Sequence, residues 1–377
     1  MSLIMPIKDL TGDRLLRFEE SLWDDSARNA LSLGCRACPD FGTCGGLHLK
    51  GGGLDCSEFC CGEPDACDGD VCRSNAQFAK RHMEVGGFRF DNIRRTAPLP
   101  LVDLPAIVPV IFHGNKRTTP FEAEAVTLKL YSLFDRRTGQ PRYRTRGALC
   151  DAFRISPAAK IVITGIEKDR QVEGWWELSV ARRTVVENLR ELGIDLVTTP
   201  NFTLHLNRPR QGDLYSMKRI ALAHQEFLAA GVQAALHVNG RTDHDFERWT
   251  KFLQEREEIK YVSYEFTTGT SRAERRRQHT RWLTELAINV KQPLHLVVAG
   301  GLNSWPDLAS AFASVIVLET STFMRTIYRM GAVAVGNAGV EWMSAPTLEG
   351  EPLNELLQRN HGVVSSAYGL LAARPIS

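Results

Sequence analysis

The sequence of 377 residues lacks several features that would each assign a protein to a class. No stretch approaches 18 consecutive apolar residues, so we expect neither a membrane-spanning helix nor a membrane partner. The N-terminal segment, MSLIMPIKDL, has neither the basic start nor the long apolar core of a secretory signal, and a cytoplasmic location is expected. The net charge is only +2, so bulk electrostatics does not by itself predict a nucleic-acid partner.

Two motifs that would indicate a particular chemistry are also missing. No G-x-G-x-x-G follows the first apolar run, so the sequence holds no specific sign of a dinucleotide-binding fold. The C-x3-C-x2-C spacing of radical-SAM enzymes is absent, because Cys60 and Cys61 are adjacent and no cysteine stands at position 63. Hydrophobic residues make up 43% and charged residues 24%, which is typical of an ordinary globular protein and excludes a disordered one.

The feature that stands out is a cluster of cysteines near the N-terminus. Eight of the nine cysteines fall between residues 35 and 72, in a segment too poor in apolar residues to be held by its own core. In a reducing compartment such clusters are more often metal ligands than disulfides. We expect bound zinc, with an iron–sulfur cluster as the alternative; His48 could equally be a solvated loop residue. The predicted ligands are Cys35, Cys38, Cys44, His48, Cys56, Cys60, Cys61, Cys67 and Cys72.

From about residue 105 onward, short apolar runs alternate with helical periodicity, as in residues 213–230, 243–257 and 272–289. Short strands separated by helices of ten or more residues predict a parallel sheet. Eight such runs favour a (β/α)8 barrel of the TIM type over an open doubly wound sheet. We therefore predict a cysteine-rich metal-binding module with flanking helices in residues 1–100, including a helical region at 11–34, and an α/β barrel in residues 101–377. The expected strands are Ala106–Phe112, Lys160–Thr164, Asp195–Thr199, Val232–Val238, Tyr261–Phe266, Leu294–Ala299, Val315–Leu318 and Ala332–Val335.

Polar residues follow most of these strands, and in a barrel functional groups gather where strands end. Glu265 is notable, because period-two alternation places it on the same face as Ser263, and a buried carboxylate needs a partner, for which Arg241 or His237 is expected. We expect these ends to form a pocket for a small polar ligand or a nucleobase. The candidate catalytic residues are Glu265, Asp169, Asp243 and His237, and the candidate substrate-binding residues are Asn201, Asn239, Arg241, Thr267, Gly300, Gly301 and Asn303.

Some of these residues have structural alternatives. His237 could be a satisfied core histidine, and Cys150, which stands apart from the cluster, is expected to pack as a core thiol. Helix N-capping is the favoured role for four residues that follow strands. These are Thr242, Asp243, Ser304 and Ser321.

Two arginine-rich segments, Arg136–Arg154 and Ser271–Trp282, could form a basic rim with the aromatic residues Tyr143 and Trp282. Such a rim would suit the phosphodiester backbone of DNA or tRNA, although solvated helix faces produce the same pattern more often. After the sixth predicted strand, Gly300–Gly301 resembles barrel loops that hold phosphate on backbone N–H groups.

Two family resemblances go beyond these patterns. The stretch Val197–Arg210 (VTTPNFTLHLNRPR), with Met217–Arg219 and His237–Asn239, resembles an uncharacterised prokaryotic and phage family of unknown function whose pattern is T-P-D-F-S. Asn201 here replaces that family's Asp. More distantly, a metal-bearing barrel with carboxylates at its mouth is similar to the tRNA-guanine transglycosylase superfamily, in which the metal motif lies late in the barrel rather than before it.

The second resemblance implies an enzyme that exchanges a guanine for a deazaguanine in tRNA or DNA through a carboxylate nucleophile. We adopt an enzyme acting on a nucleobase or nucleic acid as the leading hypothesis, with a transglycosylase-like base exchange as its specific form. The alternatives are an iron–sulfur redox enzyme and a non-catalytic binding module of a phage or defence system. The sequence does not predict the oligomeric state.

Overall fold

The computed structural model describes residues 30–31, 48–49, 81, 84–204, 210–267, 273–336, 339–348 and 350–372. The chain divides into two compact units. Unit 1 comprises Met1–Ile93, Thr203–Arg219 and Asn239–Phe252. Unit 2 comprises Arg94–Phe202, Ile220–Val238 and Leu253–Ser377, and it contains the whole of the main sheet.

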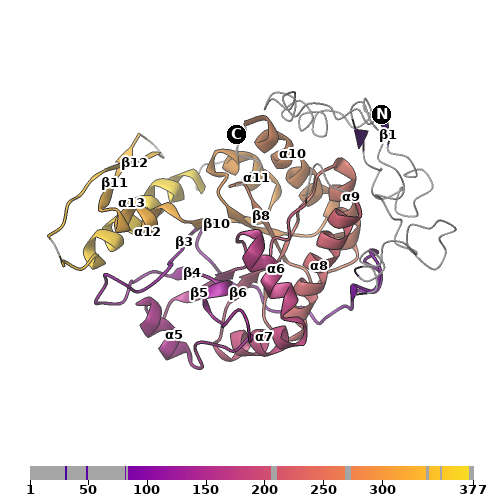
Figure 1. Cartoon of the computed structure of the whole chain (residues 1–377). Helices are drawn as coiled ribbons and strands as arrows, with labels where there is room; N and C mark the ends of the chain where they lie inside the picture. Colours follow the sequence, from indigo (N-terminus) through magenta and orange to yellow (C-terminus); the bar gives the residue numbers. More distant parts are fainter. Residues whose placement is uncertain are drawn as a thin grey trace, which may run out of the picture. The chain divides into compact units, whose positions relative to one another are not determined.

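Eight parallel strands form a TIM-like barrel in unit 2, and they follow one another around it in chain order (Figure 1). Neighbouring strands are hydrogen-bonded from β4 through to β10, and β10 returns to β3. The circle is closed by a bridge between Val110 and Thr127, where the N–H of Ile111 donates to the Thr127 carbonyl at 2.8 Å. The strands are β3 (Ile107–Pro109), β4 (Ala125–Lys129), β5 (Lys160–Thr164), β6 (Leu196–Thr198), β7 (Ala234–His237), β8 (Tyr261–Glu265), β9 (His295–Ala299) and β10 (Ser314–Glu319).

The interior of the barrel is apolar toward the amino ends of its strands. Every one of the eight strands or its extension contributes a side chain to a single buried cluster that includes Val162, Ala235 and Tyr261. The segment before β3 packs at the same end, where the N–H of Val102 donates to the Tyr261 hydroxyl at 2.8 Å and Leu104 lies against the cluster. Because these contacts cover the amino end of the strands, a ligand would reach the interior from the carboxyl end.

Helices follow seven of the eight strands, and the first strand differs. The described chain between β3 and β4 contains no helix. The C-terminal helix α13 (Asn354–Ala372) packs against that connection instead: the Asn354 side chain accepts from the N–H of Thr118 at 3.0 Å, and the N–H of Leu353 donates to the Lys116 carbonyl at 2.8 Å. The other α-helices are α5 (Arg146–Phe153), α6 (Asp169–Glu177), α7 (Arg182–Glu191), α8 (Arg210–Ala229), α9 (Asp243–Gln254), α10 (Ala273–Val290), α11 (Trp305–Ala311) and α12 (Ser321–Ile327).

Three short 3-10 helices and two small sheets complete the described elements. The 3-10 helices are η6 (Leu130–Ser132), η7 (Ser179–Ala181) and η8 (Leu302–Ser304). An antiparallel hairpin, β11 (Met330–Val335) and β12 (Gly339–Ser344), lies between α12 and α13. In unit 1, β1 (Ala30–Leu31) pairs with β2 (His48–Leu49) in antiparallel fashion.

The prediction of a parallel barrel alternating with helices is confirmed, with two errors in the strands. Ala332–Val335 is not a barrel strand, because it pairs antiparallel with β12. The barrel strand that the sequence analysis did not predict is β4, which has the sequence AVTLK. Cys150 is a buried free thiol, as expected, and burial raises its pKa.

The predicted helical region at 11–34 is wrong at Ala30–Leu31, which form a strand, and the rest of it lies outside the described residues. The cysteine ligands of the predicted metal module, Cys35 to Cys72, also lie outside the described residues, and of His48 only the backbone is described. In the described part of the chain, no helix combines the length and the apolar character needed to cross a bilayer.

Candidate functional site

The carboxylate of Glu265 lies at the carboxyl end of β8 and is held by one residue that follows β6 and one that follows β8 itself. The Asn201 Nδ2 group donates to Glu265 Oε2 at 3.0 Å, and the Thr267 hydroxyl donates to the other oxygen, Oε1. Glu265 shares a face of β8 with Tyr261, which belongs to the interior cluster, so its side chain is on the barrel side of the strand. The structure thus brings together three residues that the sequence singled out, and it leaves Glu265 partly exposed at the barrel mouth.

The network continues from Asn201 toward β4 and β5. Asn201 Oδ1 accepts from the backbone N–H of Glu167 at 3.0 Å. The Lys129 ammonium lies 3.4 Å from the Glu167 carboxylate and donates to the Ile166 carbonyl at 2.9 Å. We call Lys129, Glu167, Asn201, Glu265 and Thr267 the mouth cluster. Its side chains come from the ends of β4, β5, β6 and β8, which is where a barrel enzyme assembles its site.

Asn201 connects the two carboxylate-bearing loops because its amide is used at both ends. The side chain is only 9% exposed, so its orientation is fixed by these contacts rather than by solvent. The amide nitrogen can only donate, which matches the Glu265 oxygen that accepts from it, and the amide oxygen can only accept, which matches the Glu167 N–H. Within unit 2, the described partners of the Glu265 carboxylate are thus Asn201 and Thr267, and the predicted pairing with Arg241, which belongs to unit 1, stays a prediction.

Below the mouth cluster, the barrel interior carries a buried polar layer. Thr164 and Thr198 are paired across β5 and β6 with their hydroxyls 3.3 Å apart, and His237 is paired with Ser263 across β7 and β8. The Nδ1 atom of His237 lies 3.5 Å from the Ser263 hydroxyl, and burial lowers the pKa of His237 to about 3. At neutral pH the imidazole is neutral, so its environment matches the core-histidine alternative more closely than that of a proton donor.

Gly300 and Gly301 adjoin the mouth cluster, and both are required by the packing. Each has a φ of +76°, a conformation that favours glycine. A Cβ at Gly300 would lie 3.0 Å from Thr267 Cγ2, and one at Gly301 would lie 2.4 Å from Phe266 Cδ2. The two glycines let the loop after β9 approach the loop after β8; the next candidate, Asn303, is exposed in η8.

The N-terminus of α12 is already occupied by a carboxylate of this chain. Glu319 Oε1 accepts from the N–H of Ser321 at 2.6 Å, and Oε2 accepts from the N–H of Thr322 at 2.9 Å. The N-capping prediction is therefore wrong for Ser321. Ser304 is the N-cap residue of α11 as predicted, but its hydroxyl accepts from Thr280 at 2.9 Å and makes no capping hydrogen bond to the helix.

The remaining candidates on the loop after β7 belong to unit 1. The Asn239 carbonyl accepts from Trp249 Nε1 at 2.8 Å. The N–H of Arg241 donates to Asp245 Oδ2 at 2.7 Å, and the hydroxyl of Thr242 accepts from the N–H of Asp245 at 3.3 Å, so Thr242 caps α9 as predicted. Asp243 is the first residue of α9. The other candidate catalytic aspartate, Asp169, lies in unit 2, where it is exposed and is the first residue of α6.

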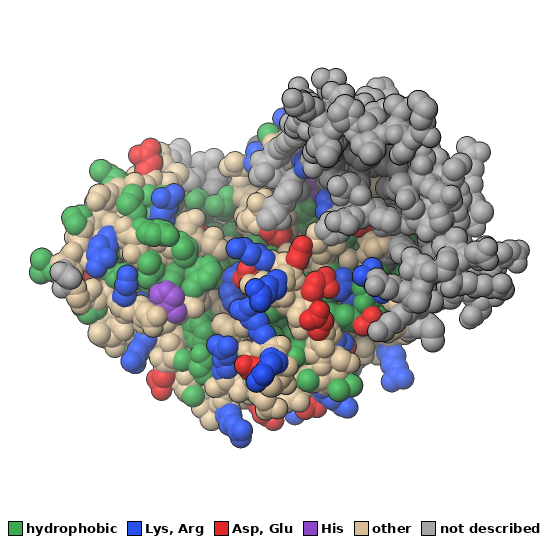
Figure 2. All heavy atoms as spheres, viewed as in Figure 1, with side chains coloured by type: hydrophobic (Ala, Val, Ile, Leu, Met, Phe, Trp, Pro, Cys, Tyr) green, Lys and Arg blue, Asp and Glu red, His purple; other side chains and the backbone are tan. Residues whose placement is uncertain are grey.

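The aromatic residues expected on a nucleic-acid rim are used for packing. Trp282 is 3% exposed and its ring meets that of His279 edge-on, while the ring of Tyr143 packs against Phe153. Arg146 donates to the carbonyls of Gly193 and Ala159, both at 2.6 Å. Figure 2 shows Lys and Arg side chains interspersed with Asp and Glu on the face where α6 and α7 lie. Bases could therefore not stack on Trp282 in this arrangement.

Sequence reasoning missed Lys129 and Tyr131 because it missed β4, and it gave Glu167 no role. The Tyr131 hydroxyl donates to the Gly165 carbonyl at 2.8 Å, which fixes the loop that carries Glu167. Burial raises the pKa of Tyr131 well above its ordinary value. The signal was present in Ala125–Tyr131 (AVTLKLY), a run rich in strand formers that ends in a lysine and a tyrosine.

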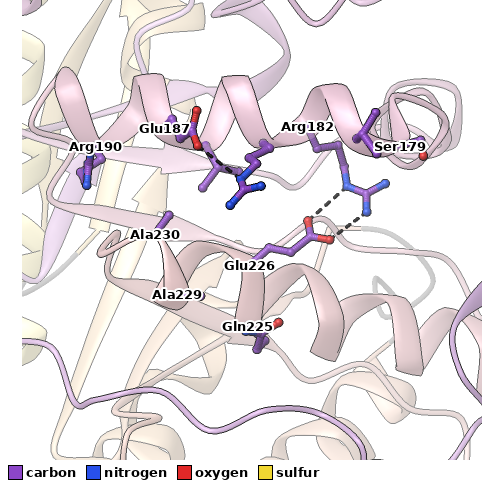
Figure 3. Close-up of a pocket in the computed structure, with 11 residues that line it drawn as sticks. Ser179, Arg182, Glu187, Arg190, Gln225, Glu226, Ala229 and Ala230 are labelled. Atoms are coloured by element: carbon purple, nitrogen blue, oxygen red, sulfur yellow. Dashed lines mark hydrogen bonds and ion pairs between the residues drawn. The ribbon is translucent and has the colours of Figure 1, made fainter.

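A groove of about 600 Å³ lies away from the barrel mouth, between α7 and α8 (Figure 3). Its main polar contact is internal, because Arg182 donates to both oxygens of Glu226, at 3.1 and 2.8 Å. Arg182 also donates to the Trp176 carbonyl at 2.7 Å and stacks over the Trp176 ring at 4.2 Å. These contacts fix the helices to each other and leave the mouth cluster as the better candidate site.

No family model matches the chain, and no curated protein is found as a relative. The resemblances to the phage-associated family and to the transglycosylase superfamily therefore remain predictions, and only the TIM-like barrel is shown.

Proposed function

We propose that the protein is an enzyme that binds a polar ligand at the carboxyl end of its barrel and uses Glu265 as the reacting carboxylate. The observation that carries the proposal is the pair of hydrogen bonds that Asn201 and Thr267 donate to Glu265. They hold a partly exposed carboxylate in a fixed orientation at the place where barrel enzymes carry out chemistry. A carboxylate with only a surface role would not require a buried amide to orient it.

In its specific form, the proposed reaction exchanges a base on a nucleoside unit of tRNA or DNA. A Glu265 oxygen forms a bond to the anomeric carbon while the bond from that carbon to the departing base breaks, and the base leaves with that electron pair and a proton. The incoming base then attacks the same carbon, breaks the bond to Glu265 and loses a proton. Lys129 and Glu167 are the proton-transfer groups that the mouth cluster offers for these steps.

The test is incorporation of labelled guanine into tRNA and into DNA by the purified full chain. Glu265→Gln keeps the size of the side chain and one oxygen that can accept from Asn201, but it removes the nucleophile, so we expect a loss of at least about 1000-fold. Glu187→Gln, on the exposed face of α7, is the matched control and should keep full activity. Equal incorporation by wild type and Glu265→Gln would contradict the proposal, as would no incorporation into either substrate.

We treat the cysteine cluster as a structural zinc module within this proposal. A colourless protein that contains zinc would support this assignment. A brown protein with visible iron–sulfur absorption would contradict it and favour the redox alternative.

A further inference from the structure

The two outer edges of the β11–β12 hairpin differ in whether their backbone groups are hydrogen-bonded by the rest of unit 2. The N–H of Ala345 donates to the Arg329 carbonyl at 2.8 Å, next to the pair Met330–Ser344. Hydrogen-bonded pairs alternate along an antiparallel ladder, so the odd-numbered residues bond across the hairpin. The backbone groups of the even-numbered residues therefore point away from the partner strand, outward from β11 on one side and from β12 on the other.

On β11, a buried side chain of α13 pairs this outer edge. Asn360 is 0% exposed; its Oδ1 accepts from the N–H of Ala332 and its Nδ2 donates to the Met330 carbonyl, both at 2.8 Å. The amide thus acts as one unit of a neighbouring strand. No further strand can pair with β11 at this position.

On β12, the corresponding outward groups belong to Val340, Trp342 and Ser344. In the part of the chain that the structure describes, their N–H and C=O groups make no hydrogen bond. The strand is six residues long and carries one charge, Glu341, with no lysine, no proline and no bulge. Free edges are normally protected by such features, because an unprotected edge pairs with another strand.

The surface beside this edge is apolar. Val333, Val335 and Met343 are 42%, 41% and 59% exposed and lie on one face of the hairpin, since the odd-numbered residues share that face. Tyr328 and Leu348 nearby are 69% and 79% exposed. Hydrophobic side chains gather over this part of the molecule, at the left of Figure 2, where α12, α13 and the hairpin lie in Figure 1. An isolated two-stranded sheet with such a face is marginally stable by itself, and added strands would stabilise it.

We propose that the β12 edge pairs antiparallel with the β12 edge of a second copy of this chain, forming a four-stranded sheet across a two-fold axis. The axis passes through the pair Trp342–Trp342 of the two copies. In this register Val340 of one copy bonds with Ser344 of the other, so every open group of both edges is used.

Glu341 and the number of backbone groups left unpaired favour this register over the two registers with the axis one residue earlier or later. An axis at Glu341 would place two like charges directly opposite each other and would leave Ser344 unpaired. An axis at Met343 would leave Val340 unpaired. With the axis at Trp342, Glu341 of each copy faces Met343 of the other in a close, non-hydrogen-bonded pair. The edge is therefore complementary to itself in one register, which favours a second copy over an unrelated strand.

The test is sedimentation equilibrium of the full chain and of charge variants at positions 341 and 343. Wild type is expected to dimerise reversibly. Met343→Glu places two Glu–Glu pairs across the axis and should raise the dissociation constant about tenfold. The double variant Glu341→Lys, Met343→Glu converts both pairs to Lys–Glu and should return the dissociation constant toward the wild-type value.

Inside one copy these residues pair with Val333 and Gly331, so the substitutions place no charge directly opposite another charge within the hairpin. Ile288→Glu adds the same charge to an exposed site on α10 and should leave dimerisation unchanged. Circular dichroism melting of each variant checks that the fold is retained. A wild type that is monomeric at its highest soluble concentration would overturn the proposal, as would a folded Met343→Glu that dimerises like wild type or a double variant that is no better than Met343→Glu.

Discussion

At the scale of single residues, the position of Glu265 was predictable, but its hydrogen bonds to Asn201 and Thr267 were not. Alternation along one strand is a local property, so the sequence placed Glu265 on the same face as Ser263. Its partners come from β6 and from the chain after β8, and which side chains meet depends on the register between strands. Asn201 was expected to bind substrate, whereas its amide is used to orient Glu265 and the Glu167 loop.

Two buried histidines predict how stability changes with pH. Burial lowers the pKa of His224 to about 4 and that of His237 to about 3, below the value of about 6.5 in an unfolded chain. The unfolded chain therefore binds more protons between these values, so the free energy of unfolding rises with pH up to about 6.5. We expect a loss of about 4 kcal/mol between pH 7 and pH 5 from the two residues together.

Urea unfolding at the two pH values measures this difference. His224→Gln and His237→Gln should each reduce it by about half, whatever their effect at pH 7. A pH difference that is unchanged in both variants would show that these groups are not the cause.

At the scale of elements, the sequence located most strands within one or two residues because they are short apolar runs between helices. Lys160–Thr164 is correct at both ends. The failures were β4 and β11, and both have the same origin. A strand at the barrel closure and a strand in a hairpin have similar apolar content, and only their pairing, parallel or antiparallel, distinguishes them.

Gly301 gives a prediction for the loop after β9. Gly301→Ala puts a side chain at a φ of +76°, with its Cβ 2.4 Å from a Phe266 atom, so the free energy of unfolding should fall by about 2–4 kcal/mol. Gly174→Ala is the matched control. Gly174 lies within α6 with no atom in the way, and alanine there should stabilise the fold by about 0.4–1 kcal/mol. Equal effects of the two substitutions in urea unfolding would contradict this account of the loop.

At the scale of the whole molecule, the sequence predicted a barrel but not which helix packs beside its first strand. The connection from β3 to β4 has no helix in the described chain, and a helix from the C-terminal end of the sequence packs against it. Contacts between residues more than 230 positions apart leave no local pattern, so composition and periodicity could not reveal them. Seven of the eight predicted strands lie in the barrel, while Ala332–Val335 lies in the β11–β12 hairpin and β4 takes the remaining place in the barrel.

If α13 is an integral part of the barrel unit, its buried side chains should contribute as much to the free energy of unfolding as those of the barrel core. Leu357 is 1% exposed, and Leu357→Ala should lower the free energy of unfolding by about 3 kcal/mol. Leu348→Ala, at a residue that is 79% exposed, should change it by less than about 0.5 kcal/mol. Comparable values for the two variants in urea unfolding would mean that α13 does not support the unit.

The central claim is that Glu265 reacts at the mouth of the barrel, and trapping its covalent intermediate tests that claim most directly. The full chain is incubated with end-labelled tRNA or DNA in the absence of an incoming base, denatured, and separated on a gel. We predict a labelled protein band whose mass-spectrometric adduct maps to Glu265 and which is missing in Glu265→Gln. An adduct on another residue, or an equal band in the variant, would contradict the claim.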